Sequence, residues 1–285
     1  MPSAHGSRAS VTPDSGCERL PAVLYGALGS FHLGRIAFLK GPSETKEILH
    51  LRVFMAQLYH HPLCPHSRFV RVTLGEYGIE PTLIEERAFD RRPEFLMMNP
   101  AGTTPVFDDG ANMRAVPGAN VIAEYLDETR GLALGSHRLM PDDPAGRVEV
   151  RRLLEWFNTK FFAEVSQWLV HEKIYKRQLP IANGGGAPDM ELVRAARVNI
   201  RYHLRYIGWL TQSRNWLAGD RMTYADLAAA AHLSSVDFLG DVPWSEDEAA
   251  KHWYARVKSR PSFRGILADR LPGLTPSPVY ADLDF

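Results

Sequence analysis

The stretch M-A-Q-L-Y-H-H-P-L-C-P-H-S-R-F-V-R, residues 55–71, determines how the rest of the chain is interpreted. Residues 56–60 are typical of a short strand, and the proline-rich turn after them leads into a helix that we expect to begin at His66 or Ser67. A helix N-terminus presents unpaired N–H groups and a partial positive charge. Cys64 and Ser67 are therefore candidates for a reactive site, because that environment stabilises a thiolate and can hold an anion.

Both residues also have an ordinary structural interpretation. Cys64 could be a small buried apolar side chain, as a cysteine in a turn most often is. Ser67 could simply cap the helix, since serine is a favoured N-cap residue. Taken alone, the stretch leaves both interpretations open.

The composition is that of an ordinary globular chain. It has 285 residues, of which 45% are hydrophobic and 23% charged, and its formal net charge is zero. This length gives room for one large or two modest domains. A balanced charge argues against nucleic-acid binding, which needs a basic excess. Cys17 and Cys64 lie in very different regions, so we expect no structural disulfide and a reducing, cytoplasmic compartment.

Residues 1–54 differ from the rest of the chain. Residues 1–17 are rich in Ser, Gly, Pro and Ala without periodicity, and we expect them to be disordered. Residues 20–39 are more apolar, but they lack both the uninterrupted run of a membrane span and the layout of a signal peptide. We therefore expect no membrane insertion and interpret residues 1–54 as a disordered or non-native extension. An extension with its own role is the alternative.

Residues 55–130 have a β-α-β pattern followed by further short elements. A proline after Thr104 opens a strand, which suits a tight turn with a cis bond before Pro105. The Asp-Gly pair at 109–110 predicts a hairpin. The sequence predicts strands at 56–60, 82–84, 106–107 and 112–115, and helices from about 66 to 78, at 93–98 and at 121–128.

The pattern changes after residue 130. Residues 131–144 are rich in Gly and Pro and are interpreted as a linker. Beyond them the apolar period is helical, and Thr223 with Asp226 resembles a capping box at the start of one helix. The predicted helices cover residues 145–176, 190–211, 227–239, 246–258 and 261–269. Residues 271–285 contain three prolines and are expected to form an extended tail.

Five ordered motifs resemble the glutathione transferase family. They are L-Y-x-x-P-x-C-P-x-S, N-P-A-G-T-T-P-V, V-I-A-E-Y-L-D-E, W-L-A-G-D-R-M-T-Y-A-D and R-P-S-F. The resemblance covers residues 55–269 and implies a fold of class α/β plus all-α. In that fold a thioredoxin-like domain, here residues 55–130, is followed by an all-α helical bundle, here residues 145–270.

The resemblance also implies a glutathione site in the thioredoxin-like domain. Cys64 or Ser67 would face the glutathione sulfur. The backbone of Thr104, just before Pro105, would pair with the cysteinyl part of the peptide.

The position that binds the γ-glutamyl end departs from the family pattern. Most active members have an acidic residue or Gln followed by Ser, whereas this chain has Gly118 and Ala119. Neither side chain can bind an ammonium or a carboxylate, although backbone N–H groups at this helix start could still hold a carboxylate. Losing two charge-assisted hydrogen bonds, each worth about 1.5–3 kcal/mol, would weaken glutathione binding by orders of magnitude. We therefore expect a vestigial site, no cofactor and no glutathione chemistry.

Further stretches resemble a narrower group, the transferase-like division proteins of alphaproteobacteria that bind the tubulin homologue FtsZ. These stretches are H-H-P-L-C-P-H-S-R-F-V-R, G-G-G-A-P, N-I-R-Y-H-L-R-Y-I-G-W-L, D-F-L-G-D-V-P-W and the terminal Y-A-D-L-D-F. The resemblance implies a homodimeric scaffold that binds FtsZ and other division proteins at the division site and supports septal wall synthesis. It also implies that the C-terminal tail carries part of the function.

A row of arginines fits such a scaffold. Arg194, Arg197, Arg201 and Arg205 recur at spacings of three and four residues, so they line one face of a helix. This face could dock an acidic partner. The alternative is a solvated face, or arginines that pair with carboxylates inside a dimer.

The tail offers a second candidate surface. Tyr280, Leu283 and Phe285 could fill pockets of a partner, while Asp282 and Asp284 maintain solubility and register. The alternative is a tail that packs on its own body.

A working glutathione-dependent enzyme is the rival hypothesis. It would use Cys64 for thiol–disulfide exchange, or Ser67 to stabilise a thiolate for conjugation. A transferase that recognises an unusual substrate through backbone groups alone is a third interpretation. We expect no metal site, because His60, His61 and His66 lack the spacing of metal ligands and an acidic neighbour.

Overall fold

The computed structural model describes residues 56–110 and 115–283. All of them belong to one of two compact units of the chain, Arg52–Phe285. The predicted extension 1–54, most of the predicted strand 112–115, and the tail residues Asp284 and Phe285 lie outside the described residues.

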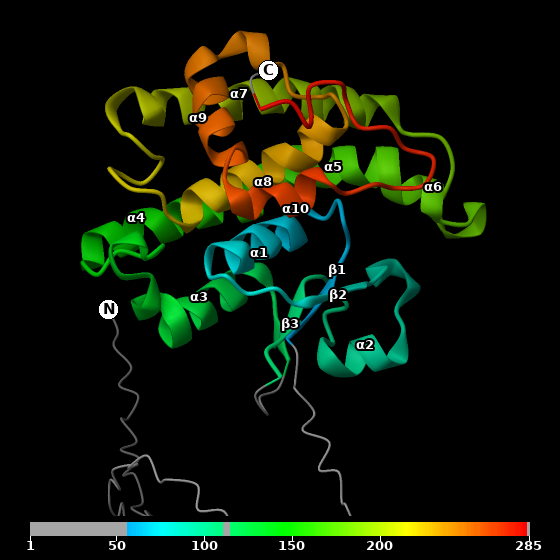
Figure 1. Ribbon diagram of the computed structural model, residues 1–285. Helices are drawn as coiled ribbons and strands as arrows, with labels where there is room; N and C mark the ends of the chain where they lie inside the picture. The colour runs from blue at the N-terminus through cyan, green and yellow to red at the C-terminus, as the bar shows by residue number, and fades with distance from the viewer. Residues whose placement is uncertain (1–55, 111–114, 284–285) are drawn as a thin grey trace, which may run out of the picture. The chain divides into compact units, whose positions relative to one another are not determined.

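A four-stranded mixed sheet, in the order β2-β1-β3-β4, forms the first half of the described chain. β1 pairs in parallel with β2 and antiparallel with β3, and β3 pairs antiparallel with β4. In Figure 1, helices α1 and α3 lie on one side of the strands and α2 on the other. The sheet with its helices confirms the predicted thioredoxin-like half. The bounds are β1 (Gln57–His60), α1 (Pro65–Glu76), β2 (Thr82–Glu85), α2 (Pro93–Met98), β3 (Val106–Asp108), β4 (Val116–Pro117) and α3 (Ala119–Arg130).

The start of α1 differs slightly from the prediction. The helix begins at Pro65, because proline is favoured in the first turn, where its missing N–H needs no partner. Cys64 is the N-cap residue, so the interpretation of Ser67 as the cap of this helix is wrong. The Thr104-Pro105 bond is cis, as predicted.

The predicted hairpin has a longer connection than expected. Phe107 pairs with Val116, and Ala115 belongs to no strand, so the prediction of a strand at 112–115 is wrong at its described end. The second strand is β4, which lies at the edge of the sheet. An edge position suits Pro117, which has no N–H to give to a further strand.

The segment 131–144, which was interpreted as a linker, contains secondary structure and buried side chains. Its first part is a short 3₁₀ segment, η2 (Gly131–His137). Leu139 and Met140 are buried in the hydrophobic core. Arg138 donates two hydrogen bonds to the carboxylate of Asp127 in α3, at 2.8 and 2.9 Å. The segment therefore packs on the body of the molecule.

The remainder is helical, as predicted. A continuous helical run from Pro144 to Gln178 confirms the helix expected at 145–176, and it contains two wider, π-helical stretches that were not predicted. Its parts are α4 (Pro144–Glu155), η3 (Trp156–Ser166), α5 (Gln167–Val170), η4 (His171–Tyr175) and α6 (Lys176–Gln178). The later helices are α7 (Met190–Ser213), α8 (Tyr224–Phe238), α9 (Glu248–Lys258) and α10 (Arg264–Leu267), and the short 3₁₀ segments are η1 (Ala88–Asp90), η5 (Ile181–Asn183), η6 (Trp244–Glu246) and η7 (Pro261–Phe263).

α8 is the central helix of the helical half. All of its 15 residues are buried, and α1 packs against it. The predicted capping box at its start is present: Thr223 Oγ1 accepts from the helix backbone, and Asp226 accepts from the Thr223 N–H at 2.9 Å. Two polar side chains thus cap the start of a fully buried helix.

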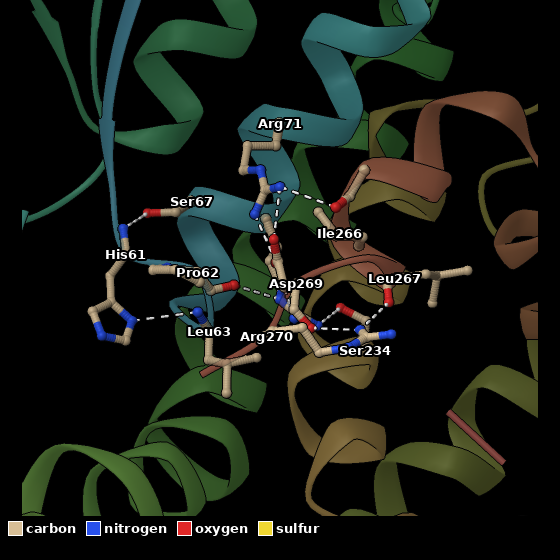
Figure 2. Close-up of polar contacts among 12 residues, drawn as sticks. His61, Pro62, Leu63, Ser67, Arg71, Ser234, Ile266, Leu267, Asp269 and Arg270 are labelled. Atoms are coloured by element: carbon tan, nitrogen blue, oxygen red, sulfur yellow. Dashed lines mark hydrogen bonds and ion pairs between the residues drawn. The ribbon is translucent and has the colours of Figure 1, made fainter. Parts of the chain in front are cut away.

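An ion-pair cluster joins α1 to the helical half (Figure 2). Arg71 donates to both carboxylate oxygens of Asp269, at 2.7 and 2.9 Å. Arg68 is fully buried and donates to Asp269 at 3.3 Å and to Ser234 of α8 at 3.0 Å. Its Nε also donates at 2.7 Å to the carbonyl of Pro62, in the turn before Cys64. The cluster therefore holds that turn against the helical half.

The described part of the tail packs on the helices. Tyr280 is fully buried, its ring contacts Phe238 edge-on at 5.2 Å, and its hydroxyl donates to the Ile266 carbonyl at 2.7 Å. Lys258 donates to the carbonyl of Val279 at 2.9 Å. Tyr280 therefore lies in the core of this chain and is not exposed. This is what the alternative interpretation, a tail that packs on its own body, expected.

Candidate functional site

A cleft of about 440 Å³ lies at the N-terminus of α1. The turn before α1, the segment before β3, the start of α3 and the helical run 144–178 form its wall. The lining includes Cys64, His66, Thr104, Gly118, Ala119 and Tyr175. The structure therefore brings four of the predicted site residues together and adds two that were not predicted.

Cys64 is almost fully buried at the N-cap of α1, and its Sγ lies 3.9 Å from the carbonyl oxygen of Thr104. Burial opposes ionisation of the thiol. Hydrogen bonds with His66 and Ser67 outweigh this effect and lower the pKa of the thiol to about 7. The site therefore favours a thiolate near neutral pH. A cysteine that served only as a buried apolar side chain would not need a lowered pKa.

His66 is the basic group that lowers the pKa of this thiol. Burial lowers its pKa, but hydrogen bonding to Cys64 and to the backbone at Asn158 raises it above the ordinary value overall. Its Nε2 lies 2.8 Å from the Asn158 carbonyl oxygen, and its ring lies 4.4 Å from that of Phe162. One feature of the sequence indicates that His66 could act on Cys64. The histidine follows the cysteine by two residues at the start of a helix.

Tyr175 approaches the thiol from the helical half. Burial, and after it the negative charge of a Cys64 thiolate, raise the pKa of the phenol well above its usual range, so the hydroxyl stays protonated. Its position late in a long helix gave no signal in the sequence.

Ser67 does not line the cleft. It is fully buried, and its hydroxyl accepts a hydrogen bond from the His61 N–H at 3.3 Å, as Figure 2 shows. It also contributes to the lowered pKa of Cys64. The geometry makes Ser67 a support of the turn that carries Cys64.

Gly118 and Ala119 lie at the start of α3, where the family resemblance places the γ-glutamyl end. Gly118 adopts φ 90°, a left-handed conformation that favours glycine. Its N–H donates to the Pro105 carbonyl at 3.0 Å, so this N–H is not available to a ligand carboxylate. Among the described residues that line the cleft, none is Asp, Glu, Lys or Arg.

The predicted arginine row lies on α7, and all four side chains are exposed. Arg197 donates twice to Asp241, at 2.6 and 2.8 Å. Arg201 pairs with Glu246. Arg197 and Arg201 therefore pair with carboxylates of their own chain. The alternative interpretation expected such pairing inside a dimer. Within the ranges 56–110 and 115–283, Arg194 and Arg205 form no ion pair.

Tyr280 is a buried position within a tail that is exposed on both sides of it. Asp282 and Leu283 are exposed, Leu283 at 43%. Across the described ranges, no helix is both long and apolar enough to cross a membrane, and no group of three His, Cys, Asp or Glu side chains is placed to hold a metal ion.

Comparison with known proteins identifies the family. The chain matches the family described as "Glutathione S-transferase, N-terminal domain" over residues 58–134, and "Glutathione S-transferase, C-terminal domain" over residues 190–261. It therefore belongs to the glutathione S-transferase family. Within it, the chain is similar to FtsZ-localized protein A of Caulobacter vibrioides, with 47% identity over 230 residues, which cover 80% of this chain and 97% of that protein.

Solved structures give the same result. A glutathione S-transferase from Sinorhizobium meliloti 1021 has 54% identity and a TM-score of 0.79, covering 81% of this chain and 100% of that one. FzlA from C. crescentus has 47% identity and a TM-score of 0.74, covering 81% and 99% of the two chains. Both solved chains are thus matched over their full or nearly full length.

Proposed function

We propose that this chain is a scaffold with the glutathione transferase fold that binds FtsZ filaments in the cytoplasm at the division site. There it supports cell division and septal wall synthesis together with other division proteins. The observation that carries the proposal is the 47% identity to FtsZ-localized protein A over 97% of that protein.

The scaffold works without glutathione chemistry. Glutathione carries two carboxylates and an ammonium, and no charged side chain of Asp, Glu, Lys or Arg among the described residues lines the cleft. Gly118 and Ala119 offer no side-chain partner, and the Gly118 N–H is already bonded to Pro105. These observations support a vestigial glutathione site and disfavour the rival enzyme.

The partner-facing groups of this proposal are exposed residues of α7 and of the tail. Arg194 and Arg205 are exposed and form no ion pair among the described residues, so they can meet acidic groups of a partner without breaking an ion pair of this chain. The contact that Arg205 makes is a hydrogen bond from its Nε to the Arg201 carbonyl at 3.3 Å. Arg197 and Arg201 would first have to leave Asp241 and Glu246. In the tail the proposal includes Asp282 and Leu283, which are exposed, and Asp284 and Phe285, which lie outside the described residues.

Co-sedimentation with FtsZ filaments tests the proposal. The chain should pellet with GTP-assembled filaments and remain in the supernatant without them. The double variant Arg194→Glu/Arg205→Glu should bind about tenfold more weakly, because two exposed attractions become repulsions. Binding of the parent should also fall as salt is raised.

A matched control reverses two exposed arginines elsewhere. Arg177→Glu/Arg221→Glu carries the same charge change at positions outside α7 and should bind as the parent does. A parent that never pellets with filaments overturns the scaffold proposal. Equal weakening by both double variants would mean that net charge, and not the α7 surface, controls binding.

Homodimer formation is part of the proposal. Val121 of α3 and Val148 of α4 are 56% and 65% exposed, on two helices that Arg151 and Glu124 bridge at 2.8 and 3.0 Å. Exposed apolar side chains on adjacent helices are typical of an interface between subunits. We propose that this face meets a second copy.

The double variant Val121→Glu/Val148→Glu should therefore be a monomer, because two carboxylates would be buried without partners at the interface. Light scattering coupled to size exclusion measures the mass. Ile181→Glu, at an apolar position that is 86% exposed, should remain dimeric. A double variant with the mass of a dimer would place the interface on another face.

A further inference from the structure

We propose that the free edge of β2 binds an extended, basic peptide segment of another protein, which adds to the four-stranded sheet as a fifth strand. This binding site is separate from the scaffold function proposed above, since it uses neither α7 nor the tail. Three features of the edge support it: main-chain groups without partners, an exposed leucine among them, and two carboxylates that form no ion pair.

β2 is an outer strand of the sheet, whose order is β2-β1-β3-β4. On its inner side the N–H of Thr82 donates to the Ala56 carbonyl at 2.8 Å, and the N–H of Glu86 donates to the end of β1 at 2.8 Å. Successive residues of a strand direct their main-chain groups to opposite edges. The N–H and C=O groups of Leu83 and Glu85 therefore point away from β1, to the free edge.

The main-chain groups on this outer side have no partner among residues 56–110 and 115–283. There β2 pairs with β1 alone, and Thr82, Leu83 and Glu85 are exposed. Pro81 precedes the strand and has no N–H, so the donors of the free edge are those of Leu83 and Glu85. A row of free main-chain donors and acceptors is what an added strand pairs with.

The opposite edge of the sheet is formed by β4, and it differs in one respect. Pro117 of β4 has no N–H to give to a further strand. Proline and lysine are residues with which proteins commonly block an edge strand. β2, with the sequence T-L-I-E, contains neither. Of these two edges, the edge of β2 is therefore the one that can accept a further strand.

The side chains of β2 define the chemistry of the added strand. Leu83 and Glu85 project from one face of the sheet, the face of Leu58 and His60 in β1. Leu83 is 44% exposed. Glu85, and Glu80 just before the strand, are exposed and form no ion pair within the described part of the chain. An added strand thus gains most from an apolar side chain beside Leu83 and a lysine or arginine beside Glu85.

The cations that follow β2 leave this negative charge in place. Arg92 pairs with Glu86, and Arg87 lies beyond the end of the strand. A second copy of this chain would bring the same two carboxylates, Glu80 and Glu85, to one short ladder, where like charges are unfavourable. A basic segment meets both carboxylates with opposite charge. The occupant is therefore a segment of another protein and not a second copy.

An antiparallel strand is the favoured arrangement, because antiparallel pairing is slightly more stable per residue than parallel pairing. Such a strand would exchange two hydrogen bonds with Leu83 and two with Glu85. In the added strand, the residue opposite Leu83 should be apolar, and the residue two positions before it should be basic. The residue between them lies opposite Ile84 and should be β-branched.

The test uses the isotope-labelled full chain and a heptapeptide with blocked ends, Ser-Lys-Ile-Val-Thr-Ser-Lys. Antiparallel pairing places its valine opposite Leu83, its first lysine opposite Glu85 and its last lysine near Glu80. Two-dimensional NMR should show shifts centred on the amides of Leu83 and Glu85. The dissociation constant should be about 1 mM, as four main-chain hydrogen bonds allow. An absence of shifts in residues 82–85 at tenfold that concentration would overturn the site.

Two N-methylated peptides test whether binding occurs by strand addition. Methylation of the valine nitrogen removes the donor that faces the Leu83 carbonyl, and it should weaken binding about tenfold. Methylation of the isoleucine nitrogen changes a group that faces away from β2 and should have a much smaller effect. Equal weakening by both methylated peptides would contradict main-chain pairing and overturn the proposal.

The variant Glu85→Lys tests the charge of the partner. The parent should bind the lysine peptide about fivefold more tightly than a peptide with glutamate in place of both lysines. Glu85→Lys should lose this preference. Glu155→Lys makes the same charge change at an exposed residue of α4 and should keep it. Parental preference in Glu85→Lys, or tighter binding of the glutamate peptide by the parent, would overturn the basic class of partner.

Two controls separate this site from the scaffold function and from self-association. Arg194→Glu/Arg205→Glu should bind the peptide as the parent does, because α8 lies between α7 and the strands in Figure 1. Weaker peptide binding by this double variant would place the peptide on α7 and overturn the proposal. Shifts of the Leu83 and Glu85 amides that grow with protein concentration, without peptide, would identify a second copy as the occupant and would also overturn it.

Discussion

The variant Asp226→Ala should lower the free energy of unfolding by about 3–5 kcal/mol, because it removes the acceptor of four hydrogen bonds in a fully buried place. Asp226 Oδ2 accepts from the Thr223 N–H and hydroxyl, at 2.9 and 3.2 Å. Its Oδ1 accepts from the N–H of Leu217 and from Nε1 of Trp253, both at 2.9 Å. Alanine would leave these donors buried without partners.

The size of this effect follows from what the carboxylate joins. Thr223 belongs to the cap of α8, Leu217 to the loop after α7 and Trp253 to α9. A cap that served only its own helix would contribute about 1 kcal/mol. Asp226 additionally holds two other segments against the start of the central helix.

Thermal and urea unfolding measure the change. A unit of this size should lose about 2–4 °C of melting temperature for each kcal/mol. Asp143→Ala is the matched control: Asp143 caps α4 with one hydrogen bond, to the Gly146 N–H at 2.7 Å, at an exposed position. It should cost about 1 kcal/mol. Similar losses for the two aspartates would contradict the role assigned to Asp226.

The start of α8 also shows what could be predicted from the sequence. A capping box depends on residues three positions apart, so Thr223 and Asp226 signal it locally. The helix Pro93–Met98 was predicted at both ends for the same reason, since the prolines at 93 and 100 limit where a helix can run. Such elements are determined by backbone chemistry and near neighbours.

The chemistry of the cleft depends on contacts that no local pattern records. His66 meets Asn158 across 92 positions of sequence, and Tyr175 lines the same cleft as Cys64 from a different half of the fold. The sequence predicted Cys64 as a reactive residue and gave Ser67, which is close to it in sequence, as the second candidate. In the structure the Ser67 hydroxyl instead stabilises the turn before α1. The packing of helices determines which side chain contacts a reactive residue. Spacing along the chain does not predict that contact.

The surface residues show the same limit. Arg197 is predicted correctly as part of an exposed row, but its carboxylate partner, Asp241, lies 44 positions away on a loop after α8. Periodicity gives the face of a helix and says nothing about what a neighbouring loop brings to that face. This is why the row divides into paired and unpaired arginines only when the fold is known.

Within a few positions the tail contains a buried residue, Tyr280, and an exposed one, Leu283. Substitutions at the two positions separate stability from partner binding. Tyr280→Ala should lower the free energy of unfolding by about 3–5 kcal/mol, as removal of a buried aromatic side chain does. The ring is fully buried, contacts Phe238 and lies 5.6 Å from the guanidinium of Arg68. Tyr280→Phe loses only the hydrogen bond to Ile266 and should cost about 1 kcal/mol.

Leu283→Ala is the informative comparison, because Leu283 is 43% exposed and its loss should change stability by no more than about 0.5 kcal/mol. If Tyr280 is the anchor and the residues after it meet the partner, Leu283→Ala should weaken binding to the division partner while the protein remains fully stable. Tyr280→Phe should bind normally. Urea unfolding and co-sedimentation with FtsZ filaments measure the two properties on the same preparations. A Tyr280→Ala variant as stable as the parent would show that the tail is not anchored, and parental binding by Leu283→Ala would remove Leu283 from the partner surface.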